Sequence, residues 1–74
     1  MSVSYDRFIE RITNKGISLH SLKKRGIITQ YAYERMSKNE PVSLDVIANL
    51  CRHFGIPIEE VVEIKLEGES DQSL

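Results

Sequence analysis

A chain of 74 residues, 41% hydrophobic and with a net charge of −1, has room for one domain with a small core, which argues against a substrate cleft of enzyme size, roughly 300 Å³ or more. The lone cysteine, Cys51, excludes an intramolecular disulfide and fits a reducing, cytoplasmic setting. No apolar run approaches the roughly 18 residues of a membrane span, and the charged N-terminus lacks the apolar centre of a signal peptide.

Helical periodicity of the apolar residues predicts five helices, at residues 4–15, 18–25, 29–37 and 43–54 and from Pro57 onward. A hydroxyl side chain stands at the expected N-cap of each of the first four: Ser4, Ser18, Thr29 and Ser43. A residue that stops a helix follows each of them: Gly16, Gly26, Pro41 and Gly55. We expect Gly26 to adopt a left-handed backbone, since the β-branched Ile27 beside it tolerates a positive φ poorly.

The apolar positions of these segments outline one core. The residues expected to face inward are Tyr5, Phe8, Ile9, Ile12, Leu22, Ala32, Tyr33, Met36, Leu44, Ile47, Leu50, Cys51 and Phe54. No run of strand length alternates cleanly between apolar and polar residues, so we predict an all-α fold, a five-helix bundle over residues 1–66. The polar residues 67–74 are expected to form a disordered tail.

The second and third segments form the unit that indicates a function. Two short helices joined by residues 26–28 match a helix-turn-helix, whose second helix protrudes far enough to enter a DNA major groove about 12 Å wide. On its outer side Gln30 suits adenine, Arg35 suits guanine, and Tyr31 suits a thymine methyl group. The side chains assigned to the DNA backbone are Ser18, Thr29, Lys38, Asn39, Lys15, His20, Lys23 and Lys24.

The distribution of charge is consistent with this interpretation. Residues 1–38 hold eight Lys or Arg and three Asp or Glu, a net charge of +5, whereas residues 39–74 hold two and eight, a net charge of −6. A basic half can meet phosphates while an acidic half faces away from them. The same pattern also fits ordinary charge scatter on a soluble surface.

The sequence resembles the lambda-repressor-like, Cro/CI or Xre-type DNA-binding domains, especially a compact single-domain branch found in bacteria and their mobile elements. The residues that carry the resemblance are Lys15-Gly16-Ile17-Ser18, Leu22, Ile28-Thr29, Met36, residues 38–44, Ile47, Leu50-Cys51, Phe54-Gly55-Ile56 and residues 58–61. The match covers roughly residues 3–66. It implies a five-helix bundle whose third helix reads DNA, with base contacts at Gln30, Tyr31 and Arg35. It places backbone contacts near Ser18, Thr29, Lys38 and Asn39.

Three side chains of the helical segments also have structural interpretations. Tyr33 is expected to pack in the core with its hydroxyl at the rim. Glu34 is expected to pair with Lys38 four residues later rather than to read cytosine. Cys51 is expected to be a small core residue, because a nucleophile would need a base nearby.

We therefore expect a sequence-specific regulator that binds double-stranded DNA, acts as a repressor, and is not an enzyme. One cysteine and two histidines do not match a zinc-finger spacing, and no catalytic motif is present, so we expect no metal, cofactor or small-molecule substrate. The alternative is a protein-interaction module or antirepressor on the same fold, which the near-neutral net charge and Glu40 favour.

A single module of this size makes a small DNA interface, so we expect a homodimer that reads two half-sites about 34–36 Å apart. The candidate dimer surface is the predicted fifth helix: Val61, Val62, Ile64 and Leu66. The same apolar residues could instead simply close the core.

Overall fold

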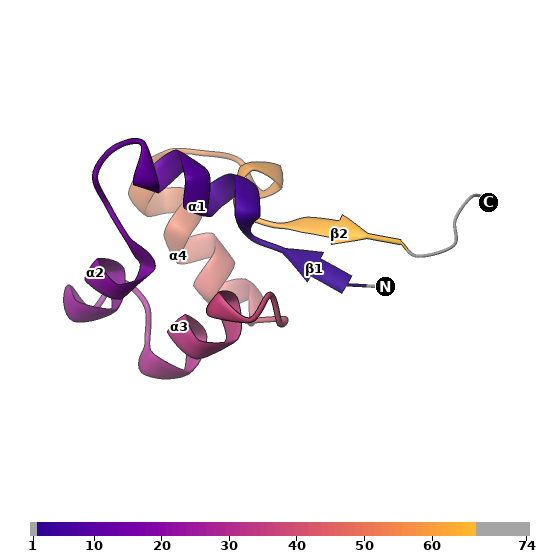
Figure 1. Cartoon of the computed structure of the whole chain (residues 1–74), viewed down its shortest axis with the longest axis horizontal. Helices are drawn as coiled ribbons and strands as arrows, with labels where there is room; N and C mark the ends of the chain where they lie inside the picture. Colours follow the sequence, from indigo (N-terminus) through magenta and orange to yellow (C-terminus); the bar gives the residue numbers. More distant parts are fainter. Residues whose placement is uncertain (1, 67–74) are drawn as a thin grey trace.

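The computed structural model describes residues 2–66, in which four α-helices pack beside a small antiparallel sheet (Figure 1). In chain order the elements are β1 Ser2–Ser4, α1 Asp6–Thr13, α2 Leu19–Lys24, α3 Gln30–Ser37, α4 Leu44–Phe54, the 3₁₀ turn η1 Ile58–Glu60 and β2 Glu63–Lys65. The first four predicted helices are confirmed, with slightly shorter ends. Within residues 2–66 no helix has the length and apolar character needed to cross a membrane. The tail predicted at 67–74 lies outside the described residues.

The predicted fifth helix is wrong, and with it the expectation of a strictly all-α fold. After Gly55 the chain makes only the short turn η1 and then enters β2, which pairs antiparallel with β1. Val3 stands opposite Ile64 in this ladder, so the two ends of the described chain lie side by side (Figure 1). Strands of three residues are too short to give a clear alternating pattern, and the β-branched residues around them suit a strand better than a helix.

Hydroxyl side chains begin α2, α3 and α4, as the sequence predicts. The cap hydrogen bonds run to Ser18 from the Ser21 amide (3.1 Å), to Thr29 from Ala32 (3.1 Å) and to Ser43 from Val46 (3.4 Å). The predicted cap of α1 is wrong, because Ser4 lies in β1 and Tyr5 occupies the N-cap position. The Ser4 hydroxyl still accepts a hydrogen bond from the Asp6 amide, so it satisfies one free donor at the start of that helix.

One hydrophobic core joins all four helices and the segment before β2. The buried apolar residues are Tyr5, Phe8, Ile12, Leu19, Leu22, Ile28, Ala32, Met36, Ile47, Leu50 and Val61. Phe8 of α1 also packs edge-on against Phe54 of α4, with ring centroids 5.5 Å apart. Leu44, predicted to face inward, is 74% exposed, because it is the first residue of α4 and the neighbouring elements leave it uncovered.

The turn between α2 and α3 depends on Gly26, whose φ of +77° confirms the predicted left-handed conformation. At this turn the Gly26 amide donates to Lys23 and the Ile27 amide donates to Leu22, which satisfies the last carbonyls of α2. The chain can then reverse direction and bring Ile28 into the core ahead of α3.

Replacing Gly26 with alanine should destabilise the domain by about 1–2 kcal/mol, because an L side chain is strained at this φ. A Cβ at this position would meet no atom within 4 Å, so backbone strain is the expected cause. The measurement is the free energy of unfolding in urea. Gly26→Asn is the matched control, since asparagine tolerates the left-handed region, and an equal loss in both variants would contradict the explanation.

Candidate nucleic-acid interface

Helices α2 and α3 lie next to each other, with α2 at the end of the molecule away from the two-stranded sheet (Figure 1). Of the eight residues of α3, Ala32 and Met36 are buried, and they hold the helix against the core. The opposite side, which we call the outer face of α3, carries Gln30, Tyr31, Glu34 and Arg35. Tyr31 is 65% exposed on this face, while Arg35 is half-buried. The helix therefore presents polar and aromatic groups on a buried support.

The half-buried ring of Tyr33 connects α2 to α3. His20 lies edge-on to this ring at a centroid distance of 6.0 Å, and the Lys23 ammonium lies 5.2 Å from its centre. Tyr33 packs against the core, as predicted. These contacts place two of the predicted backbone-contacting residues, His20 and Lys23, directly beside α3.

The side chains of the outer face are engaged with one another and with the loop that follows. The Gln30 amide donates to Glu34 at 2.7 Å, and no ion pair within residues 2–66 joins Glu34 to Lys38, so the expected pairing of these two residues is wrong. The Arg35 guanidinium lies over the Tyr31 ring, 5.3 Å from its centroid. The outer face is thus a set of oriented groups.

Residues 38–42, here called the loop after α3, are held by Tyr5 at the start of α1. The Tyr5 amide donates to the Asn39 side-chain oxygen at 3.0 Å, and the Tyr5 hydroxyl donates to the Glu40 carbonyl at 2.7 Å. Asn39 has a φ of +57°, a conformation that asparagine tolerates better than most residues. Sequence reasoning assigned Tyr5 only to the core and missed this second role. The signal available was an asparagine at the end of a helix two residues before a proline.

Arg35 is in turn held by this loop. Its Nε donates to the Pro41 carbonyl at 2.6 Å, and its Nη1 lies 3.9 Å from a Glu40 carboxylate oxygen. Burial raises the pKa of the Tyr5 hydroxyl, an effect that the Val42 backbone and the positive charge of Arg35 partly offset.

The predicted backbone-contacting residues lie along α2, at the N-terminus of α3, at the start of the loop after α3 and beyond the end of α1. Ser18 and Thr29 cap the N-termini of α2 and α3, and both are exposed. Lys24 is exposed at the end of α2, and Lys38 is exposed where α3 meets its loop. The side-chain oxygen of Asn39 already accepts a hydrogen bond from the Tyr5 amide. His20 and Lys23 of α2 lie against Tyr33 of α3, whereas Lys15 lies beyond the end of α1.

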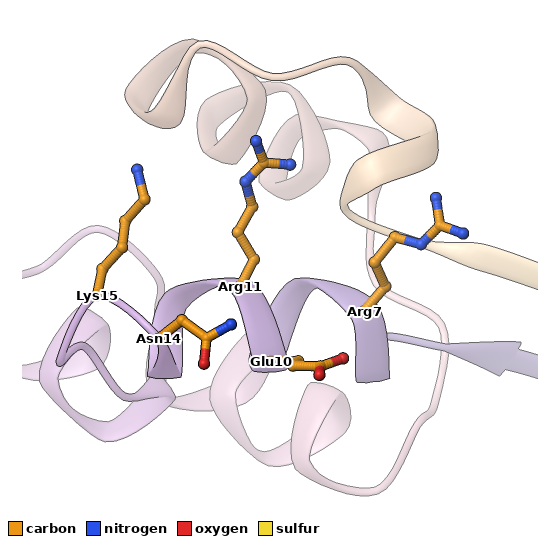
Figure 2. Close-up of a pocket in the computed structure, with 5 residues that line it drawn as sticks. All are labelled: Arg7, Glu10, Arg11, Asn14 and Lys15. Atoms are coloured by element: carbon orange, nitrogen blue, oxygen red, sulfur yellow. The ribbon is translucent and has the colours of Figure 1, made fainter.

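Three cations project to one side, Arg7 and Arg11 from α1 and Lys15 from the turn after it (Figure 2). Arg11 pairs with Glu60 of η1, and Arg7 lies 3.8 Å from Glu63 of β2. The acidic half of the chain therefore does not simply face away from the basic half, because two of its carboxylates neutralise arginines of α1.

The predicted dimer residues separate into buried and exposed groups. Val61 is 1% exposed and belongs to the core, so it is unavailable to a partner, whereas Val62 is half-buried. Ile64 and Leu66 are 56% and 66% exposed.

Beside these residues is an open apolar groove of about 400 Å³. Its lining is Val3, Tyr5, Pro41, Val42, Leu44, Ile47, Ile58, Glu59, Val62 and Ile64. The groove is larger than the composition led us to expect. Glu59 is the one charged residue in this lining.

Residues 7–67 match the family model of the Cro/C1-type helix-turn-helix DNA-binding domain. The chain belongs to this family. The structure is also similar to that of the transcriptional regulator VanUg, with a TM-score of 0.75 and 21% identity over 84% of this chain and 83% of that chain. At this identity the similarity establishes the shared fold. No curated protein matches the chain.

As a Cro/C1-type domain, the chain carries its helix-turn-helix in α2 and α3, where the sequence resemblance placed it. The assignments of individual residues to bases or phosphates stay predictions. The fold shows two features that the sequence did not indicate. One is the hydrogen bond from Arg35 to the loop after α3, and the other is the apolar groove beside the sheet.

The pKa of Tyr5 predicts how stability changes at high pH. Because the folded-state pKa is raised, the unfolded chain loses this proton first, and stability should fall as the pH rises above about 10. Thermal unfolding at pH 8 and pH 10.5 should show a smaller loss for Tyr5→Phe than for the wild type. Equal losses in the two proteins would rule out Tyr5 as the source.

Proposed function

We propose that this domain is a transcriptional regulator that binds double-stranded DNA at specific sequences, with α3 in the major groove, and represses by occupying an operator. The observation that carries the proposal is the division of α3 into a buried side, Ala32 and Met36, and an outer face of hydrogen-bonding groups. Membership of the Cro/C1-type family and the likeness to a transcriptional regulator support it.

Each group of the outer face has a proposed role. Gln30 and Arg35 read bases, because amide and guanidinium groups pair bidentately with adenine and guanine, and Tyr31 packs against a thymine methyl group. Ser18, Thr29, Lys38 and Asn39 position the domain on phosphates. Further attraction to the DNA backbone comes from cations and a histidine near that region: Lys15, His20, Lys23 and Lys24.

We further propose that two copies bind together and meet at the apolar groove. Three of the five large hydrophobic residues exposed within residues 2–66 line this groove: Leu44, Ile58 and Ile64. A symmetric dimer needs one patch that supplies both projecting side chains and a hollow to receive them. Projecting leucine and isoleucine side chains beside a groove of about 400 Å³ meet this requirement.

Selection of bound duplexes from a random pool tests the main proposal. We expect one enriched sequence arranged as a palindrome, and its affinity should fall linearly with salt on logarithmic axes as counterions are released. Binding with no sequence preference would contradict specific recognition.

The alternative is a protein-interaction module or antirepressor on the same fold. The contact of Glu40 with Arg35 and the pairing of acidic residues with α1 favour it, because both reduce the positive charge offered to phosphates. The absence of DNA binding at low salt would support this alternative.

Arg35→Ala should weaken binding to the selected duplex by about 1–3 kcal/mol and relax the preference at one base pair, because a bidentate base contact is lost. Lys38→Ala should weaken all duplexes about equally, because a phosphate contact carries no sequence information. Both effects are measured by titrating selected and unrelated duplexes. An unchanged base preference in Arg35→Ala would remove Arg35 from the reading residues.

Leu44→Glu should favour the monomer and weaken self-association at least tenfold, because an unpaired carboxylate would be buried at the interface. The fold should tolerate the change, since position 44 is 74% exposed and an acidic residue suits the first turn of α4. Sedimentation equilibrium, with and without the selected duplex, measures the association. Thr13→Glu, exposed on α1, is the charge-matched control, and equal behaviour of the two variants would place the contact elsewhere.

A further inference from the structure

We propose that Tyr5 is a positioning residue for DNA reading: it fixes the loop after α3, and the loop fixes the guanidinium of Arg35. The inference rests on the proposed function, because it concerns the side chain assigned to a base. Tyr5 lies outside the helix-turn-helix and 30 positions before Arg35 in the sequence. The chain of contacts between them runs through Glu40 and Pro41.

The first link is the hydrogen bond of 2.6 Å from the Arg35 Nε to the Pro41 carbonyl. A guanidinium has five N–H donors in a rigid planar fork, so fixing one of them restricts the orientation of the whole group. With Nε engaged, the two terminal nitrogens remain as the pair able to contact two acceptors on one guanine edge. The Tyr31 ring beneath the guanidinium limits its movement further.

The second link fixes the Pro41 carbonyl itself. Proline has no backbone N–H, so this residue cannot anchor itself by donating a hydrogen bond, and its position depends on its neighbours. The Glu40 carbonyl accepts the Tyr5 hydroxyl at 2.7 Å, and the Glu40 amide donates to the Arg35 carbonyl at 2.8 Å. Asn39 accepts from the Tyr5 amide. Tyr5 therefore holds the two residues that precede Pro41.

The third link is the rigidity of Tyr5. It is 1% exposed and belongs to the core cluster, whereas Lys38, Asn39, Glu40 and Pro41 are all exposed. Within residues 2–66 the Tyr5 hydroxyl is the one side-chain donor to the Glu40 carbonyl. Its removal should let the exposed loop, and the arginine attached to it, sample more conformations.

Loss of this positioning should affect the discrimination between bases more than the attraction to phosphates. A side chain already held in its bound orientation loses less freedom on association, so releasing Arg35 should reduce its discrimination between bases by about two- to tenfold. Attraction to phosphates does not depend on this orientation. The affinity for unrelated duplexes should fall less than this, because Lys38 and Asn39 are the only proposed phosphate-contacting residues that lie in the loop.

Tyr5→Phe tests the proposal, with Ile12→Val as a control that removes a methyl group from the core within α1. Both are compared at a temperature where both are folded, on the selected duplex and on one altered at the base pair that Arg35→Ala affects. We expect Tyr5→Phe alone to lose discrimination about two- to tenfold, and we expect Tyr5→Phe with Arg35→Ala to match Arg35→Ala.

The possible failures are distinguishable. Full discrimination in Tyr5→Phe, with loss in Arg35→Ala, would overturn the positioning role alone. Unchanged preference in Arg35→Ala would overturn that role together with the proposed base contact. A loss in Ile12→Val equal to that in Tyr5→Phe would also overturn it, because reduced stability would then account for both.

A second measurement examines the hydrogen bond between the Arg35 Nε–H and the Pro41 carbonyl in the free protein. The NMR signal of the Arg35 Nε–H should exchange slowly with water in the wild type. In Tyr5→Phe it should exchange as fast as that of the exposed Arg25. Slow exchange that persists in Tyr5→Phe would show that the loop is fixed without the hydroxyl, which would overturn the proposal.

Discussion

The burial of Ala32 and Met36 is the contact on which the rest of the interface depends. With eight residues, α3 is shorter than the roughly 12–15 residues at which isolated helices become even marginally stable in water. It persists because its inner side joins the core and because Thr29 caps its first turn. The same burial decides which residues point outward, since a helix repeats every 3.6 residues. The support and the proposed recognition surface are thus two sides of one helix.

Much of the fold was predictable because its signals are local. Helices α2, α3 and α4 each follow a capping hydroxyl, and Gly26 adopts the backbone conformation that its position requires. The region after Gly55 was not predictable, because β2 exists through pairing with β1 about 60 residues earlier in the chain. Spacing marks Leu44 as a core residue, but whether another element covers it depends on the complete packing.

The candidate site also has features that local sequence predicts and features that depend on distant contacts. Helical spacing alone indicates that Gln30, Tyr31 and Arg35 lie away from the core. The contacts that orient Arg35 could not be predicted in this way. They pass through the loop after α3 to Tyr5, which lies 34 positions before Asn39 and 35 before Glu40. Likewise, the pairing of Arg11 with Glu60 joins residues 49 positions apart. Such distant pairs leave no periodic signal in a single sequence.

In the proposed function, DNA contacts the outer face of α3 while the buried side of the helix stays in place. Backbone amide NMR spectra recorded during titration with a duplex containing the selected site test this most directly. The largest shifts should fall on residues 29–39 and on the start of α2, with the strands β1 and β2 little changed. Shifts concentrated on β1, β2 and η1, with α3 unaffected, would contradict it.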